Sequence, residues 1–422
     1  MSEACCALLV IERDGEERFL VAGYRDRRGA IAVSEVPPAR GSKQNLEPEE
    51  VEQVSGDDVV ALVAGAETER SPSFVALRRD GTLYRWERTH VGPRGAPRWR
   101  ATALPVPPDA CTTLAAYSDG TLLLGARSGA LYVSRERAAP SVLSALAAFV
   151  TSGDTDYVGT PRLPGRGAGA AVTALLVTRR GTVVSGNARG ELHVWETWRG
   201  GGARERWNTA RLVGAASASA VTALAEIGND ALVAAHADGA LHVWRSERDT
   251  YVRDADVPRA HTRAVTALAV YRDTASAADA SRDRFEPLAA TPCVLLAGGD
   301  DGAVSSYALA RSAAWGDRAL EPRLRRALGA PVSALAVLAH HRLVLEALRD
   351  GGISIARLPV DGYVQMPYPP ATTQVDARER RATFPRLEPA RGALGALAWT
   401  GDAARAPTRL PPTAALMAEV QR

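Results

Sequence analysis

Short segments in which apolar and polar residues alternate run along most of this chain, and glycines separate them. Seven times a glycine follows an apolar run and opens a new alternating one, the pattern of two strands joined by a hairpin. Glycine supplies the positive φ that a tight turn requires, and a preceding aspartate strengthens the hairpin signal. The glycines are Gly29, Gly81, Gly129, Gly190, Gly239, Gly302 and Gly351, and the preceding aspartates are Asp80, Asp238, Asp301 and Asp350.

A second apolar element lies upstream of each hairpin. It reads Val-Thr-Ala-Leu at 172–175, 221–224 and 265–268, Val-Ser-Ala-Leu at 332–335 and Val-Val-Ala-Leu at 59–62, with looser copies at 5–8 and 112–114. Successive turn glycines are 48 to 63 residues apart, and three of the six steps lie within one residue of 49. Each repeat therefore supplies three predicted strands, and we expect a fourth, outer strand in the variable stretches between repeats.

These repeats predict an all-β fold. A lone sheet of three or four strands cannot bury both of its faces, whereas sheets stacked radially into a closed ring do so and leave few exposed edges. We predict a single β-propeller over residues 1–422 with seven four-stranded blades, or eight with the last incomplete. The predicted blades lie near 4–50, 57–105, 110–165, 170–215, 219–258, 263–325 and 330–375, with 376–422 as ring closure or a partial extra blade and 272–291 as a flexible insertion.

The best-formed repeat gives a family resemblance. His261 opens the segment His-Thr-Arg-Ala-Val-Thr-Ala-Leu-Ala-Val, and Asp301-Gly302 follows at the hairpin. Together with tryptophans at the end of three hairpins, this resembles the repeats of the WD40 family. The resemblance implies structural roles for the histidine, the turn aspartates and the tryptophans, although no repeat carries the complete set. These positions are His261, Asp80, Asp238, Asp301, Asp350, Trp86, Trp195 and Trp244.

Composition excludes several classes of protein. The chain has 422 residues, 46% of them hydrophobic and 23% charged, which is an ordinary globular balance. Its formal net charge is +3, so no overall field directs it to nucleic acid or to a membrane surface. No apolar run approaches a membrane span and no basic signal region opens the chain. We expect an intracellular protein, cytoplasmic or nuclear, that is not secreted.

Arginine gathers at one position of the repeat. Lys43 is the only lysine, so nearly all basic residues are arginines. Four of the seven residues that lie two positions before a turn glycine are arginines, namely Arg27, Arg79, Arg127 and Arg349. In a propeller these turns lie on one face, and guanidinium groups bind carboxylates and phosphates in pairs of hydrogen bonds. We take the four arginines as candidate binding residues for an acidic or phosphorylated protein segment; the alternative is solvated turn arginines.

Catalytic and metal-binding patterns are weak. The cysteines Cys5, Cys6, Cys111 and Cys293 have neither disulfide-framework nor zinc spacing, so we expect reduced thiols, no metal and no cofactor. His193 and His242 occupy equivalent repeat positions, which indicates a structural role. Gly165-Arg-Gly-Ala-Gly169 leads into a predicted strand, whereas a phosphate-binding loop precedes a helix.

The resemblance and these absences favour a non-catalytic scaffold that binds other proteins in an intracellular multiprotein complex. WD40-like subunits occur in nuclear pore, mRNA export, ribosome assembly and trafficking complexes, and the sequence does not distinguish among these. The alternative is a propeller enzyme or enzyme subunit, such as a WD40-type hydrolase, that uses the central channel. We do not expect nucleic acid or a small molecule as the main partner.

Overall fold

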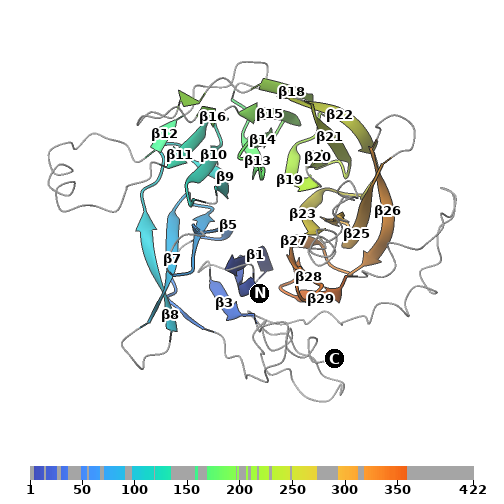
Figure 1. Cartoon of the computed structure of the whole chain (residues 1–422). Coiled ribbons are helices and arrows are strands. Elements are labelled where there is room, and N and C mark those ends of the chain that lie inside the picture. Colours follow the sequence, from blue (N-terminus) through green and yellow to red (C-terminus); the bar gives the residue numbers. More distant parts are fainter. Residues whose placement is uncertain are drawn as a thin grey trace, which may run out of the picture.

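The computed structural model describes residues 4–13, 16–25, 30–36, 49–54, 57–66, 71–90, 97–117, 119–134, 157–159, 169–195, 197–198, 206–207, 211–215, 218–227, 231–247, 250–272, 293–311 and 318–358. Within these ranges the regular structure is β-strand: seven sheets form blades around a central opening, and an eighth sheet has only two strands (Figure 1). The predicted all-β propeller with seven blades is confirmed. The possible eighth blade, at 376–422, and most of the 272–291 insertion lie outside the described residues.

Each blade is an antiparallel meander whose first strand lies nearest the opening (Figure 1). The first strands are β1 (Ala4–Arg13), β5 (Val59–Ala64), β9 (Cys111–Ala116), β13 (Val172–Val177), β19 (Val221–Ile227), β23 (Val265–Arg272) and β27 (Val332–Leu338). The second strands are β2 (Glu16–Arg25), β6 (Ser73–Arg78), β10 (Leu122–Ala126), β14 (Val183–Asn187), β20 (Ala231–His236), β24 (Cys293–Gly299) and β28 (Leu343–Leu348).

Third and fourth strands complete the blades toward the outside. The third strands are β3 (Ile31–Glu35), β7 (Leu83–His90), β11 (Leu131–Ser134), β15 (Glu191–Trp195), β21 (Leu241–Glu247), β25 (Ala303–Arg311) and β29 (Ile353–Arg357). The fourth strands, found in blades 2 to 6, are β8 (Pro97–Leu104), β12 (Tyr157–Gly159), β18 (Arg211–Ala215), β22 (Thr250–Val257) and β26 (Arg318–Ala327). Blades 1 and 7 have three strands among the described residues, and a short ribbon pairs β16 (Thr197–Trp198) with β17 (Arg206–Trp207).

Packing between blades closes the ring. Each first strand contacts the first strands of both neighbouring blades, and β1 contacts β27 as well as β5. The second strands are covered on both faces, and every residue of β6, β10, β14, β20 and β28 is buried. This explains why these segments read as continuous apolar runs rather than as alternating ones.

The hairpin turns form as the sequence predicts. Six of the seven turn glycines lie among the described residues, and their φ angles are between 72° and 94°. The preceding aspartates close the turns: Asp80 Oδ1, for example, accepts the N–H of Thr82 at 2.9 Å. In repeat four, where no aspartate precedes the glycine, Asn187 Oδ1 instead accepts the N–H groups of Arg189 and Glu191.

A hydroxyl group in the first strand joins most blades to the next. The Thr of Val-Thr-Ala-Leu, and Thr112 at the same position of blade 3, donate to the first carbonyl of the following blade, at 2.5 to 2.6 Å in four junctions. Ser333 makes the equivalent bond to the Cys5 carbonyl and so links blade 7 to blade 1. We call these the inter-blade hydroxyl bonds; their donors are Thr112, Thr173, Thr222, Thr266 and Ser333.

Glycine in the second strand lets blades approach closely. A Cβ atom built on Gly186 would lie 2.4 Å from Val221 Cγ1 of the next blade, and one on Gly298 would lie 2.6 Å from Val332 Cγ1. Real Cβ contacts are never so short, so a larger residue there would push the blades apart. Val221 and Val332, which open β19 and β27, are therefore fitted against the preceding blade.

Blades 1 and 2 are joined differently. Cys6 and Val60 occupy the hydroxyl position in these blades, so neither blade has a hydroxyl group there. Residues 49–54, which we call the connecting segment, instead run along the outside of both blades. Within it β4 (Glu50–Val51) pairs in parallel with β8, and the Gln53 side-chain amide bonds both the N–H and the carbonyl of Ile31.

Buried aromatic rings fill this junction. Trp99 and Phe74 are both fully buried, and Trp99 meets Phe19 of blade 1 edge to face at 5.3 Å between ring centroids. Glu49 of the connecting segment accepts Trp99 Nε1–H at 2.5 Å and forms an ion pair with Arg88. Blade 1 is thus held to blade 2 by the connecting segment and an aromatic core.

Candidate functional site: the two mouths of the channel

The propeller has two faces that differ in their turns. Turns between first and second strands lie on one face, which we call the first-turn face. Turns between second and third strands, which contain the repeat glycines, lie on the opposite face, which we call the second-turn face. Because antiparallel strands alternate in direction, the end of each first strand reaches the first-turn face and its start lies at the second-turn face.

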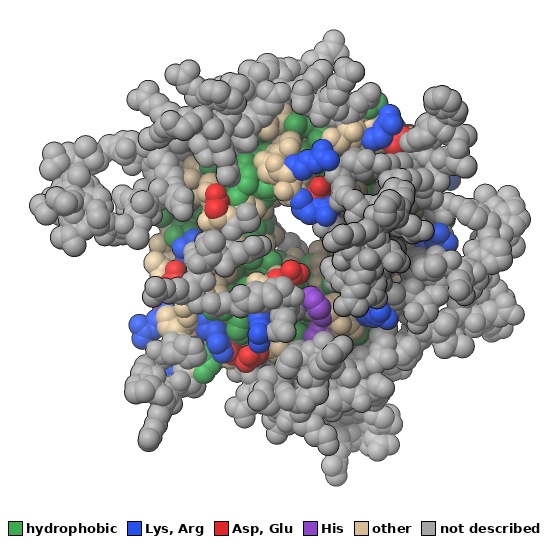
Figure 2. Space-filling model, viewed as in Figure 1, with side chains coloured by type: hydrophobic (Ala, Val, Ile, Leu, Met, Phe, Trp, Pro, Cys, Tyr) green, Lys and Arg blue, Asp and Glu red, His purple; other side chains and the backbone are tan. Residues whose placement is uncertain are grey.

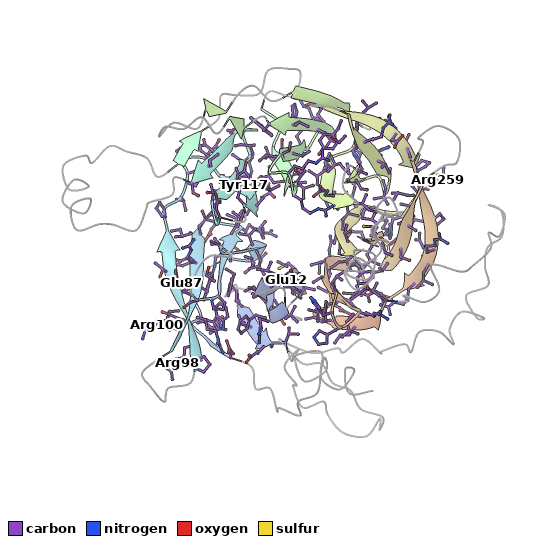
Figure 3. All side chains as sticks on the ribbon, viewed as in Figure 1. Glu12, Glu87, Arg98, Arg100, Tyr117 and Arg259 are labelled. Carbon is purple, nitrogen blue, oxygen red and sulfur yellow. The ribbon has the colours of Figure 1, made fainter. Side chains whose placement is uncertain are left out.

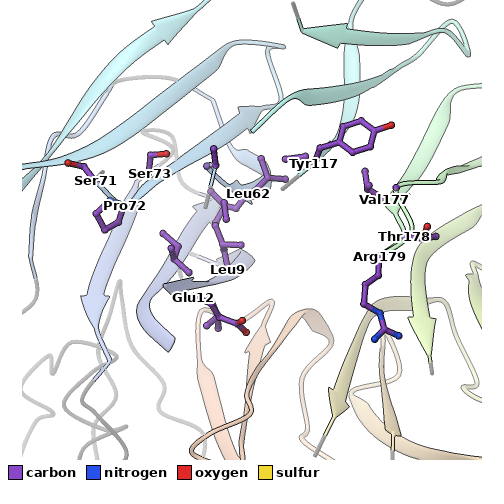
Figure 4. A pocket seen from close by; sticks show the side chains of 18 of the residues that line it. Leu9, Glu12, Leu62, Ser71, Pro72, Ser73, Tyr117, Val177, Thr178 and Arg179 are labelled. Atoms are coloured by element: carbon purple, nitrogen blue, oxygen red, sulfur yellow. The ribbon is translucent and has the colours of Figure 1, made fainter. Parts of the chain in front are cut away.

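A cavity of about 960 Å³ opens on the first-turn face. Its wall is made by the ends of β1, β5, β9 and β13 and by the chain that follows them, so it spans blades 1 to 4 (Figure 4). Leu9, Leu62 and Val177 give it an apolar surface, and Tyr117 adds an aromatic ring. This volume is at the upper end of the range for small-molecule sites, about 300–1,000 Å³, and is sufficient for several residues of a peptide.

Opposite charges stand at separate parts of the cavity. Glu12, exposed at the end of β1, belongs to blade 1, whereas Arg179 and Arg180 form the turn after β13 in blade 4 (Figures 3 and 4). Arg179 pairs with Glu226 of blade 5 at 3.4 Å and donates its backbone N–H to the same carboxylate. Arg180 is exposed and forms no ion pair with any described residue. Since Glu226 neutralises Arg179, the positive charge on the blade 4 side of the cavity comes from Arg180.

The described lining does not assemble a catalytic set. Glu12 is its one carboxylate, and the lining contains neither histidine nor cysteine. A serine or threonine nucleophile needs a base within hydrogen-bonding reach, and Ser71, Ser73 and Thr178 have no imidazole beside them in this wall. Among the described residues no group of three or more His, Cys, Asp or Glu side chains is placed to hold a metal ion.

The candidate arginines lie on the second-turn face. Arg79, Arg127 and Arg349 each donate the backbone N–H to the carbonyl just before the first strand of their own blade, at 2.8 to 2.9 Å. They are therefore held at the start of the first strands, around this mouth of the channel. All three are exposed, and Arg27 lies outside the described residues.

Acidic neighbours reduce the charge of two of these arginines. Arg79 pairs with Asp58 at 3.2 Å, and Arg349 pairs with Asp300 of blade 6 at 2.7 Å. Arg127 makes no ion pair with a described residue. Blades 2 and 3 are neighbours, whereas blade 1 separates Arg349 from them. Arg127 is thus the one described candidate arginine that no acidic side chain neutralises.

The His–Asp pair of repeat six forms a buried network. His261 Nδ1 lies 2.9 Å from Asp301 Oδ1, and Asp301 also accepts the N–H of Thr262 and a bond from Arg325. Burial alone would raise the pKa of Asp301, but the hydrogen bonds from His261 and the Thr262 N–H outweigh it and lower the pKa to about 2. Tyr307 occupies the tryptophan position of this repeat and is also buried.

Solved structures with a similar fold were found by comparison. Sqt1 from Chaetomium thermophilum matches with a TM-score of 0.54 and 17% identity, over 83% of this chain and 82% of Sqt1. Sqt1 bound to the N-terminus of the ribosomal protein L10 matches with a TM-score of 0.55 and 15% identity, over the same shares of the two chains. This chain folds as a WD40-type β-propeller. No family model and no curated protein matches its sequence.

The three repeat tryptophans of this WD40-type propeller are buried, but they differ in their hydrogen bonding. Trp195 donates Nε1–H to Ser185 on the neighbouring strand at 2.8 Å, and Trp86 donates to the Glu52 carbonyl of the connecting segment at 3.0 Å. Trp244 has no partner for its Nε1–H among the described residues. The three tryptophans therefore share no common hydrogen-bonding arrangement among the described residues.

Among the described residues, four histidines and two cysteines of this WD40-type fold are buried: His193, His236, His242, His261, Cys5 and Cys111. In repeat five His242 Nδ1 lies 2.5 Å from Asp256, and burial lowers the pKa of the adjacent His236. Cys5, Cys6, Cys111 and Cys293 are all free thiols, and burial raises the pKa of Cys5 above its usual range. In the described part of the chain no helix has the length and apolarity to cross a membrane.

The cavity residues were not found by sequence reasoning. Glu12, Arg179 and Arg180 lie in first turns, which share no common residue from repeat to repeat, so no pattern marks them. The arginines two places before the turn glycines were found because the repeat aligns them. Their neutralising partners were missed, since Asp58 and Asp300 become neighbours only when the blades are assembled.

Proposed function

We propose that this protein is a non-catalytic scaffold that binds extended segments of other proteins within an intracellular complex. The cavity on the first-turn face is its main docking site. The observation that carries this proposal is the concave wall built jointly by four blades, which combines apolar side chains with polar and charged ones. Concave surfaces that combine apolar side chains with placed polar groups are the usual form of a binding site.

The likeness to Sqt1 supports a protein partner. That propeller has been crystallised with the N-terminus of a ribosomal protein, which is a terminal segment of another chain. A rigid ring with a wide mouth suits such a segment, because the site needs little rearrangement when it binds. The partner of the present chain is expected to bind in a comparable extended form.

The test is to fill the cavity. Ser71 lines the cavity and is exposed, so Ser71→Trp should block it without disturbing the core. The matched control is Thr102→Trp on the exposed outer strand β8. Both variants and the wild type would be tagged and purified from the native cells, and the co-purified proteins quantified. Loss of a near-stoichiometric partner in Ser71→Trp alone supports the proposal; equal recovery in all three contradicts it.

The second-turn face is a second candidate docking surface, for an acidic or phosphorylated segment. Arg127 favours it, since this exposed guanidinium forms no ion pair with a described residue, and Arg79 belongs to the neighbouring blade 2. Replacing Arg27, Arg79, Arg127 and Arg349 by alanine should abolish capture of such a segment. Unchanged capture would exclude this surface. Direct binding of nucleic acid by the same arginines would instead show a steep fall of affinity with salt.

A further inference from the structure

We propose that the cavity on the first-turn face selects a protein segment of mixed charge. The segment carries apolar side chains at its centre, a basic residue on the blade 1 side and an acidic residue on the blade 4 side. This inference rests on the proposed docking function and names the chemistry of the partner. It follows from where the charges of the lining stand.

Blade 1 contributes the negative charge. Glu12 lies near the end of β1, and its side chain is exposed at the opening (Figure 3). It forms no ion pair with a described residue. A basic side chain of a bound segment can therefore reach it without displacing an internal partner, and the gain is not reduced by the breaking of an existing bond.

Blade 4 contributes the positive charge. Arg179 is engaged by Glu226 of the next blade, and this contact holds the turn 179–181 in place. The adjacent Arg180 is exposed and has no described acid as a partner. Its guanidinium can bind a carboxylate with two parallel hydrogen bonds. The two ends of the cavity thus prefer opposite charges.

Apolar side chains accompany both charges. Leu9, Leu62 and Val177 come from three different blades; Leu9 and Leu62 lie on the Glu12 side of the cavity and Val177 on the Arg179 side (Figure 4). All three are only partly buried, so a bound apolar side chain would remove further apolar surface from water. Side chains of both signs surround the opening in the space-filling view (Figure 2), which shows no single-sign field that would favour a uniformly charged partner.

The experiment uses three capped eight-residue peptides with two central leucines. One has a basic and an acidic end, one has two acidic ends and one has two basic ends, so the result does not depend on the direction in which the chain binds. Affinities would be measured by calorimetry at low salt. Wild type should bind the mixed-charge peptide about 5- to 10-fold more tightly than the other two, a size ordinary for partly exposed charge pairs.

Charge reversal should redirect this preference. Glu12→Arg should prefer the doubly acidic peptide and Arg180→Glu the doubly basic one, while the double variant should return to the mixed-charge peptide. Controls of the same type are Glu87→Arg and Arg259→Glu, because both residues lie on the outside of the propeller (Figure 3). These should leave the preference unchanged, and circular dichroism should show the same fold in all variants.

Two results would overturn the inference, and neither would be confused with failure of the docking function. Equal affinity of wild type for the three peptides would refute charge selection even though binding occurs. Absence of binding by all three would refute the stated partner chemistry. The docking function itself is judged separately, by loss of the native partner in Ser71→Trp.

Discussion

Two parts of this ring are held together by different means. From blade 3 round to blade 1, each junction carries an inter-blade hydroxyl bond from a Thr or Ser in the first strand. Between blades 1 and 2 that hydroxyl is absent, and the connecting segment, a buried ion pair and four aromatic rings take its place. The comparison shows that blades of one propeller can be joined in two ways: by one hydrogen bond that recurs at successive junctions, or by an extensive aromatic contact at a single junction.

The aromatic junction should be the more sensitive to one substitution. Trp99→Ala removes a fully buried ring that contacts Phe19 and Phe74. The free energy of unfolding should fall by about 3–5 kcal/mol, as for other buried aromatic residues. Urea unfolding monitored by circular dichroism would measure it. A loss below 1 kcal/mol would mean that this junction does not depend on its core.

The ion pair of the connecting segment should matter next. Glu49→Gln keeps the size of the side chain but removes its charge, leaving Arg88 without its partner. Since the Glu49 side chain is only 6% exposed, the loss should be about 1–3 kcal/mol. The control is Glu87→Gln, whose exposed carboxylate should contribute almost nothing. The same urea titration applies, and equal losses in the two variants would contradict the prediction.

A single inter-blade hydroxyl bond should contribute less. Thr173→Val preserves the shape of the side chain but removes the donor to the Val221 carbonyl. The expected loss is about 1 kcal/mol, since one neutral hydrogen bond is removed and a partly buried carbonyl is left without it. Thr102→Val on the outer strand should be neutral. If Thr173→Val were also neutral, the hydroxyl bonds would be incidental to the ring.

The smallest expected effect is a gain. Val60 stands at the hydroxyl position of blade 2 and is 37% exposed. Val60→Thr should add the missing bond to the Cys111 carbonyl of blade 3 and raise the free energy of unfolding by about 0.5–1 kcal/mol. A crystal structure of the variant would check the new bond directly. A decrease in stability would show that the blade 2–blade 3 junction has a geometry of its own.

The sequence allowed the ring to be predicted because each blade is a local unit. Each repeat contains one turn glycine and one segment like Val-Thr-Ala-Leu, so the spacing between them predicts both the strands and the turns. The threonine was visible too, but its bond joins different repeats and could be seen only once the blades were stacked. Likewise the parallel pairing of Glu50–Val51 with β8 follows no alternation pattern, since two residues are too few to show one.

The functional surfaces were less predictable for a related reason. Arg79, Arg127 and Arg349 were identified because they share a repeat position. Structure alone revealed that Asp58 and Asp300 neutralise two of them. Glu12 and Arg180 had no such alignment, since the first turns differ in length and residues. Functional residues that share a repeat position can therefore be found by comparing the repeats of one chain. Functional residues that come together only when the blades assemble around the cavity cannot be found in this way.

The bond from Ser333 to Cys5 joins positions 328 residues apart, and this has a consequence for synthesis. At about 5–20 residues per second, translation needs roughly 15–65 s to pass from one to the other. During that time the flank of β1 that packs against blade 7, with Leu8 and Val10, has emerged without its neighbour. A nascent chain of this kind offers a molecular chaperone a defined apolar strand to shield, and release must wait until the final described blade has been made.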